Sequence, residues 1–295
     1  MQALSRMAKL DSKTAIITGA GRGLGQQVAC AFAREGASVV LCARTETELS
    51  EAASDIRRAG HSCLAVQADI GNPRDAGKLV QAALDAYGKI DILVNNAAIQ
   101  GPIGPLAESD EVEWTKAIQI NLLGTYYCTR RVLPHMIAAR KGKIINLSGG
   151  GATAARPNFS AYAASKAAIV RLTETLAEEV APFDIQVNAI APGVLSTQML
   201  REVVAAGNRA GTKEMEGAQS GQNLGADSFA KAAALAVFLG SDASGGLTGR
   251  LVSAQHDGWE TWDGEQIGRL MRKPWLTLRR LDEFTLAKLT DHDKP

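Results

Sequence analysis

The sequence predicts an α/β fold, in which a doubly wound parallel sheet of about seven strands carries helices on both faces. Short apolar segments rich in β-branched residues alternate with longer segments of helical periodicity. The apolar segments show little polar alternation, which is typical of strands buried on both faces. The expected strands are residues 14–19, 38–43, 62–69, 91–97, 143–148, 185–190 and 249–254.

The segments between the strands carry helix signals. Residues 47–60 place apolar side chains on one face and end at a glycine. A long helix is expected over about 110–138, with a break near Pro134 because proline lacks an N–H donor. Another helix is expected over residues 228–241.

The chain shows no linker and no internal repeat, so we predict one domain over residues 1–258 with a C-terminal extension at 259–295. Residues 196–225 contain five glycines and many polar residues. A long irregular insertion in a compact domain is usually functional, which predicts a lid. The extension carries three tryptophans and a basic segment. We interpret it as a solvated surface, with a subunit contact or a flap over the substrate as alternatives.

Composition excludes several classes of function. The 295 residues carry a net charge of +1, so neither nucleic acid nor an acidic membrane is indicated as a partner. The four histidines lie far apart without metal-binding spacing, which predicts no metal site and a structural or surface role. They are His61, His135, His256 and His292.

Cellular location is predicted from cysteine usage and the chain ends. The four cysteines are scattered without a CxxC pair, as expected for buried thiols in a reducing compartment. The N-terminus lacks the apolar region of a signal peptide, and no apolar run reaches the ~18 residues of a membrane helix. A cytoplasmic protein is therefore expected.

The motif TGAGRGLG at residues 18–25 follows an expected strand and opens an expected helix. Gly19, Gly23 and Gly25 allow a tight turn and a close approach of the backbone to a pyrophosphate. The helix N-terminus adds free N–H groups. A lone glycine cluster is equally consistent with a structural turn, but this context favours a dinucleotide site.

The spacing TGxxxGxG, with NNAA at residues 95–98 and the pair Tyr162 and Lys166, resembles the short-chain dehydrogenase/reductase family. The resemblance covers about residues 10–255, and the motifs follow in the family's order. It implies a Rossmann-type fold and an oxidoreductase that interconverts a small secondary alcohol and a ketone. It also implies a homotetramer or dimer built partly on the helices at 110–138 and 160–180.

The end of the second expected strand bears on the cofactor. An acid there binds the ribose hydroxyl of NAD, whereas an arginine favours the 2′-phosphate of NADP. Ala43 stands where NAD-dependent members of the family carry aspartate, and Arg44 follows. Arg22, within the glycine turn, resembles the second basic residue of NADP-dependent members. Two guanidinium groups near one phosphate make charge-assisted contacts, so NADP(H) is expected, with NAD(H) as the alternative.

The resemblance implies further cofactor contacts. Asp69 would lie beside the adenine, although alone it fits an ordinary turn carboxylate. Asn95 would line the cofactor groove and also hold the central strands. The remaining implied contacts are Leu24, Ile70, Ala97, Pro192, Gly193, Val194, Thr197, Tyr162 and Lys166.

Tyr162 and Lys166 lie four residues apart in an expected helix, so both side chains can face one cleft. A free tyrosine has a pKa of about 10 and is a poor catalyst near neutrality. A cation ~5 Å away at an effective dielectric of ~20 stabilises the phenolate by roughly 3 kcal/mol. We therefore predict that the lysine lowers the tyrosine pKa by about two units. The family resemblance makes Tyr162 the acid/base and lets Lys166 also hold the nicotinamide ribose.

Two further residues belong to the implied reaction centre. Asn121 matches the family's asparagine that supports a water link to the lysine. The family's substrate-orienting serine lies thirteen residues before the tyrosine, and that position is Gly149 here. Ser148 is the adjacent hydroxyl, which on a regular strand points to the opposite face, although three glycines could re-aim it. Thr153, Asn158 or a water are alternative donors.

The missing serine also motivates a second hypothesis. A relative that kept the fold and the cofactor could have lost turnover and act as a nucleotide-binding or regulatory protein. The intact set of tyrosine, lysine and asparagine favours the enzyme.

Overall fold

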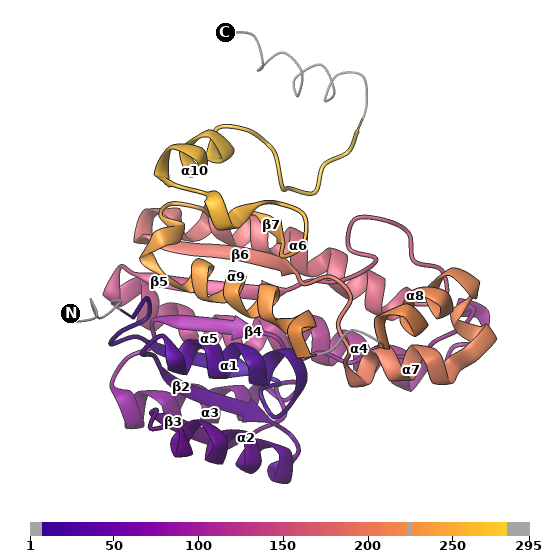
Figure 1. The fold of residues 1–295 in the computed structure, drawn as a ribbon, viewed down its shortest axis with the longest axis horizontal. Coiled ribbons are helices and arrows are strands. Elements are labelled where there is room, and N and C mark those ends of the chain that lie inside the picture. The colour runs from indigo at the N-terminus through magenta and orange to yellow at the C-terminus, as the bar shows by residue number, and fades with distance from the viewer. Residues whose placement is uncertain (1–7, 223–225, 282–295) are drawn as a thin grey trace, which may run out of the picture.

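The computed structural model describes residues 8–222 and 226–281. Within this part of the chain, seven parallel strands form one sheet in the order β3-β2-β1-β4-β5-β6-β7 (Figure 1). The predicted doubly wound sheet is thus confirmed. The strands are β1 (Thr14–Thr18), β2 (Ser38–Ala43), β3 (Cys63–Gln67), β4 (Ile92–Asn95), β5 (Gly142–Leu147), β6 (Ile185–Ala191) and β7 (Leu251–Ser253).

Helices cover both faces of the sheet (Figure 1). Helices α1, α2 and α9 pack on one face, and helices α3, α5 and α6 pack on the other. The helices are α1 (Gly23–Arg34), α2 (Glu46–Arg58), α3 (Pro73–Tyr87), α4 (Glu111–Ile118), α5 (Gly124–Ala139), α6 (Ser160–Val180), α7 (Gln198–Ala206), α8 (Thr212–Gln222), α9 (Ala230–Gly240) and α10 (Gly264–Met271).

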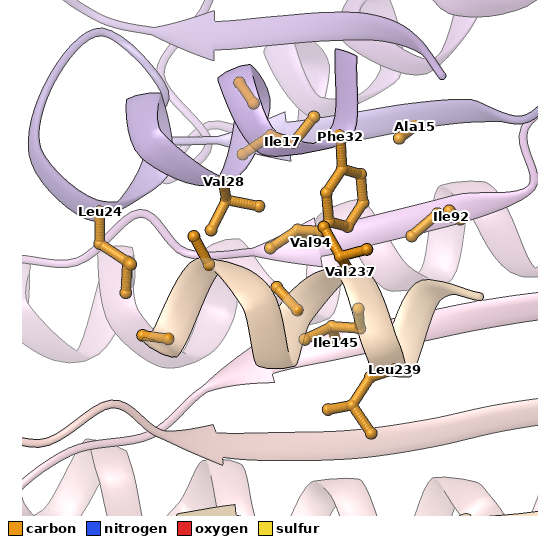
Figure 2. Close-up of a cluster of buried hydrophobic side chains, with 14 of the residues drawn as sticks. Ala15, Ile17, Leu24, Val28, Phe32, Ile92, Val94, Ile145, Val237 and Leu239 are labelled. Atoms are coloured by element: carbon orange, nitrogen blue, oxygen red, sulfur yellow. The ribbon is translucent and has the colours of Figure 1, made fainter. Parts of the chain in front are cut away.

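Successive strand residues serve opposite faces of the sheet. Ile17 of β1 packs with α1 and α9, whereas its neighbour Ile16 packs on the other face. Figure 2 shows Val28 and Phe32 of α1 directed toward β4, with α9 beside them. Burial on both faces explains why apolar residues follow one another in β1 and β5 without polar alternation, as at Ile16–Ile17 and Ile144–Ile145.

The strand order places β1 beside β4, although β2 and β3 separate them in the chain. From this pair the chain winds outward in both directions. The loops after β1 and β4 therefore leave the sheet toward opposite faces and open a crevice at the carboxyl ends of the strands.

The predicted long helix is interrupted at a different place from the one expected. A short π-helix, Gln119–Leu123, joins α4 to α5, and Pro134 lies inside α5. Pro134 is exposed, so the carbonyl it leaves unpaired can bind water and the helix continues. The π-helix places one extra residue at Asn121, a position that becomes important below.

The predicted lid is ordered into helices. Residues 198–222 form α7, a short 3₁₀ turn and α8, while residues 223–225 lie outside the described part. Figure 1 shows α7 and α8 side by side at one end of the sheet. Their apolar side chains, including Val203 and Ala218, cluster with Phe159 and Tyr162. The segment therefore packs directly against the expected reaction centre.

Part of the C-terminal extension packs against the domain. Trp259 is 7% exposed and donates a hydrogen bond to the Ala254 carbonyl at 3.2 Å. Arg279 pairs with the buried Glu174 of α6 at 3.2 Å. The interpretation as a solvated surface is thus wrong for Trp259, whereas Trp275 and Arg279 are exposed as expected. A domain boundary at residue 258 stays a prediction, and residues 282–295, with His292, lie outside the described part.

In the part of the chain that the structure describes, no helix is both long and apolar enough to cross a bilayer. The four cysteines carry free thiols. Cys42, Cys63 and Cys128 are buried, and Cys30 is half-buried.

A buried lysine lies at the N-terminal end of β5. Lys143 is 7% exposed, and its Nζ donates to Ser244 Oγ at 3.0 Å and to the Gly245 carbonyl at 3.4 Å. Burial lowers the pKa of its ammonium from 10.5 to about 8.

Lys143 should therefore make stability depend on pH. Between pH 8 and 10.5 the unfolded chain keeps a proton that the folded chain has lost, so the free energy of unfolding rises with pH. We expect the rise to exceed that of a Lys143→Met variant by about 3 kcal/mol, measured by urea unfolding at several pH values. Parallel pH curves for the two proteins would contradict this expectation.

Candidate active site and dinucleotide cleft

A cleft of about 1080 Å³ opens at the carboxyl ends of the strands. It brings together most residues that the sequence singles out, from the turn after β1 to the segment after β6. The predicted residues that line it are Gly19, Arg22, Gly23, Leu24, Gly25, Arg44, Asp69, Ile70, Ala97, Ser148, Tyr162, Lys166, Pro192, Gly193, Val194 and Thr197.

Asn95 is not among the residues that line the cleft. Its Nδ2 donates to Asn146 Oδ1 at 2.9 Å and to Thr129 Oγ1 at 3.0 Å, so it joins β4 to β5 and α5. The expected strand-holding role fits this placement, while a contact with the cofactor stays a prediction. Asn96 faces the cleft instead, with Nδ2 donating to the carbonyls of Thr18 and Gly19 at 2.9 and 3.1 Å.

The glycine turn is packed so closely that side chains cannot enter it. A Cβ added to Gly25 would lie 2.5 Å from Asn96 Nδ2 and closer still to the Gly19 carbonyl oxygen. Gly19 has a φ of +66°, a region that favours glycine. Helix α1 begins at Gly23 with no side-chain cap and no acidic residue in its first turn. Its free N–H groups are thus available to an anion in the cleft.

Both expected basic residues lie at this end of the cleft. Arg44 is exposed, and its carbonyl accepts from Gln67 Nε2 at 3.0 Å. Arg22 Nη1 donates to Glu48 Oε1 at 2.6 Å, and Glu48 also lines the cleft. Sequence reasoning missed this carboxylate, which neutralises part of the positive charge and competes with a phosphate for Arg22.

Asp69 and Thr197 each have a local structural role besides lining the cleft. Asp69 Oδ1 accepts from the Gly71 backbone N–H at 2.9 Å and so holds the turn after β3. Thr197 Oγ1 accepts from the Leu200 N–H at 3.3 Å and caps α7. Thr197 thereby connects the cleft to α7 of the predicted lid.

Tyr162 and Lys166 occupy one turn of α6 and face the same cleft. Lys166 Nζ lies 5.5 Å from the centre of the Tyr162 ring and donates to the Leu147 carbonyl at 2.7 Å. The side chains are 9% and 3% exposed, respectively. The predicted proximity of ammonium and phenol is present in the structure.

The predicted direction of the tyrosine pKa is wrong for the protein without ligand. Burial raises the pKa of the Tyr162 phenol above its ordinary value, and the nearby Arg156 guanidinium only partly opposes this. Burial also lowers the pKa of Lys166 to about 8. The attraction between the ammonium and the phenolate is outweighed by the free-energy cost of removing both charged groups from water.

Asn121 lies in the π-helix and does not itself line the cleft, but it fixes the elements around the pair. Its Oδ1 accepts from the Ile99 N–H at 2.8 Å, and its Nδ2 donates to the Ile99 carbonyl at 2.9 Å. Nδ2 also donates to Ser165 Oγ at 3.1 Å, and Ser165 Oγ donates to the Tyr162 carbonyl at 2.7 Å. A hydrogen-bond chain thus runs from the loop after β4 to the tyrosine backbone.

Position 149, rather than 148, faces the phenol. A Cβ added to Gly149 would lie 2.6 Å from the Tyr162 hydroxyl oxygen. Ser148 is 3% exposed, and among the described residues its Oγ has no hydrogen-bond partner. Ser148 still lines the cleft, so this buried hydroxyl is one polar atom that a ligand could satisfy.

Several cleft residues were not identified from the sequence. Arg156 follows the three glycines and pairs with Glu214 of α8, with Nη2 and Oε2 2.8 Å apart. No local pattern links two residues so far apart in the chain. His256, interpreted as structural or surface, is exposed at the cleft. Within the described ranges no group of three or more His, Cys, Asp or Glu side chains is arranged to hold a metal.

The fold and the site together define a class of dinucleotide-dependent oxidoreductase. A family model described as short chain dehydrogenase matches residues 13–208. Oxidoreductase UcpA of Escherichia coli is 39% identical over 248 residues, which cover 82% of this chain and 93% of that protein. A 3-oxoacyl-acyl-carrier-protein reductase of Synechocystis is 34% identical over 200 residues, which cover 68% of this chain and 81% of that protein. The chain belongs to the short-chain dehydrogenase family and is an oxidoreductase of the NAD(P)-dependent kind.

Solved structures agree with this assignment. An NAD⁺-bound xylitol dehydrogenase superposes with a TM-score of 0.77 at 28% identity, covering 83% of this chain and 98% of the other. A gluconate 5-dehydrogenase from Burkholderia cenocepacia in complex with NADP and tartrate superposes with a TM-score of 0.72 at 28% identity. The match covers 89% of this chain and 98% of the other. These relatives bind different nicotinamide cofactors, so the preference of this chain is a separate question.

The packing of Gly25 leads to a test of the glycine turn. We expect Gly25→Ala to weaken NADPH binding at least about 100-fold, because the new methyl group pushes the Gly19 carbonyl out of place. Fluorescence titration with NADPH measures the effect. Gly264→Ala is the control, since nothing lies within 4 Å of a Cβ added there. An unchanged NADPH affinity in Gly25→Ala would show that this turn is not part of the NADPH-binding site.

Proposed function

We propose that the protein is an NADP(H)-dependent reductase or dehydrogenase that interconverts a small secondary alcohol and a ketone, with Tyr162 as acid/base. The observation that carries the proposal is that Tyr162 and Lys166 face the same cleft as the glycine turn. A proton donor and a dinucleotide site in one cavity are what this chemistry requires.

The residues present fit a nicotinamide dinucleotide. The N–H groups at the start of α1 suit a pyrophosphate, and the glycines leave no side chain in its path. Arg22 and Arg44 line the region after β2 where a 2′-phosphate is read in this fold, and no acid stands at position 43. Asp69, Ile70 and Ala97 would complete the adenine side, while residues 192–194 and Thr197 would meet the nicotinamide side.

Each residue of the reaction centre has its own task. The bound cofactor supplies or accepts the hydride. The Tyr162 hydroxyl gives a proton to the substrate carbonyl oxygen in reduction and takes it back in oxidation. Lys166 would hold the ribose and provide positive charge beside the phenolate. Asn121 connects α6 to the loop after β4. In this position it would support a water link to Lys166.

The resting protonation state favours reduction near neutral pH. Burial raises the pKa of Tyr162, so the phenol keeps the proton that a carbonyl substrate needs. Oxidation of an alcohol requires the phenolate, so we expect the rate of oxidation to increase with pH. Ser148 is the hydroxyl we assign to substrate orientation, because its buried Oγ lacks a partner among the described residues.

Removing the phenol hydroxyl tests the central assignment. We expect Tyr162→Phe to lower turnover by about 10²–10⁴-fold, because the proton-transfer group is lost. NADPH affinity should change little, since the rest of the cleft remains. Steady-state assays with a panel of diketones, sugars and β-ketoacyl thioesters, alongside NADPH titration, measure both quantities. Undiminished turnover in the variant would exclude Tyr162 as the acid/base.

The cofactor preference has a separate test. We expect NADPH to bind more tightly than NADH. The Arg44→Asp variant should narrow or invert this difference in affinity, because an acid repels the 2′-phosphate of NADPH and accepts a hydrogen bond from the ribose hydroxyl of NADH. Arg58→Asp, an exposed arginine on α2, is the matched control and should leave the ratio unchanged. Equal affinities in the unmodified protein would overturn the NADP preference.

The second hypothesis is a non-catalytic dinucleotide-binding or regulatory protein. Gly149 is the observation that favours it, because the usual serine is absent there. Tight NADPH binding without reduction of any ketone in the panel would support it. Assembly into a dimer or tetramer and residence in the cytoplasm stay predictions, which sedimentation analysis and cell fractionation can check.

A further inference from the structure

Arg156 lies between the three glycines that follow β5, residues 149–151, and the lid helices α7 and α8. Its side chain is 16% exposed. Nε and Nη2 donate to Oε2 of Glu214 at 3.0 and 2.8 Å, so a lid carboxylate fixes the orientation of the guanidinium. Both residues line the cleft. A guanidinium this buried and held by two hydrogen bonds keeps a defined position relative to its neighbours.

The guanidinium also packs on two aromatic rings. Its central carbon lies 3.9 Å from the centre of the Phe159 ring and 5.4 Å from the centre of the Tyr162 ring. Two of the glycines lie beside Arg156. A Cβ added to Gly150 would lie 3.7 Å from Arg156 Nε, and one added to Gly151 would lie 3.2 Å from Arg156 Cβ.

Seven charged or titratable side chains line the cleft from the elements around Tyr162. Lys166 comes from the same helix and Arg156 from the preceding loop. Arg201 and Glu202 come from α7, Lys213 and Glu214 come from α8, and His256 follows β7. The Lys166 ammonium is bound to the Leu147 carbonyl. The Arg156 guanidinium opposes the effect of burial on the Tyr162 pKa.

We propose that Arg156 is a positioning residue for the acid/base: its guanidinium, oriented by Glu214 of the lid, stabilises the Tyr162 phenolate. The proposal rests on the proposed role of Tyr162. A positive charge about 5 Å from the phenol still acts strongly in a space with little water. Glu214 cancels part of that charge, so the lid sets how strongly Arg156 acts.

The test measures the titration of Tyr162 directly. The full chain is labelled with ¹³Cζ-tyrosine, and Tyr162 is assigned by its absence in Tyr162→Phe. We expect the titration midpoint to move to higher pH in Arg156→Gln, to return toward the unmodified value in Arg156→Lys, and to move to lower pH in Glu214→Gln. Alcohol oxidation by Arg156→Gln should fall about tenfold at pH 7, with the loss shrinking as pH rises.

Arg209→Gln is the matched control. It removes another ion pair of the lid segment, Arg209 to Glu108 at 3.1 Å, and should leave the midpoint in place. An unchanged midpoint in Arg156→Gln, or a shift in the same direction in both Arg156→Gln and Glu214→Gln, would show that the pair only holds the lid and would overturn the proposal. If the unmodified protein has no turnover, the proposed function fails while the midpoints still decide the role of Arg156.

Discussion

The exclusion of water around Lys166 governs the chemistry of the whole site. The ammonium is 3% exposed and held by one backbone carbonyl, and its pKa falls to about 8. The same burial acts on Tyr162 in the opposite sense, because its charged form is the phenolate. Both groups are thus biased toward their neutral forms. Any ligand that brings negative charge into the cleft will favour the ammonium, so the charge state of the site follows its occupancy.

Three separate parts of the chain hold this buried pair in place. The Leu147 carbonyl at the end of β5 fixes Lys166, and the Ser148 N–H is bound in turn to the Ile190 carbonyl of β6 at 2.8 Å. From the other side, Asn121 and Ser165 connect the loop after β4 to the Tyr162 backbone. The geometry of the pair therefore depends on the order of the central strands as much as on the spacing within α6.

Local features of the site could be predicted from the sequence, and long-range ones could not. The strands and the glycine turn follow from patterns within a few residues, and the spacing of Tyr162 and Lys166 follows from helix geometry. The choice between Asn95 and Asn96 depends on where β4 ends, which composition does not fix to one residue. The π-helix at Asn121 has no sequence signal. The pairing of Arg156 with Glu214 and the burial that raises the Tyr162 pKa arise only when the lid packs on the cleft.

The three glycines after Ser148 do different things, although in the sequence they form one flexible run. Gly149 faces the Tyr162 hydroxyl, so its missing side chain determines how close the phenol comes to the turn. Gly150 and Gly151 border Arg156 instead. Each of the three glycines therefore lies beside a larger side chain, which is Tyr162 at Gly149 and Arg156 at Gly150 and Gly151. Position 149 therefore offers no hydroxyl to a substrate, and a Cβ placed there would lie 2.6 Å from the Tyr162 hydroxyl oxygen.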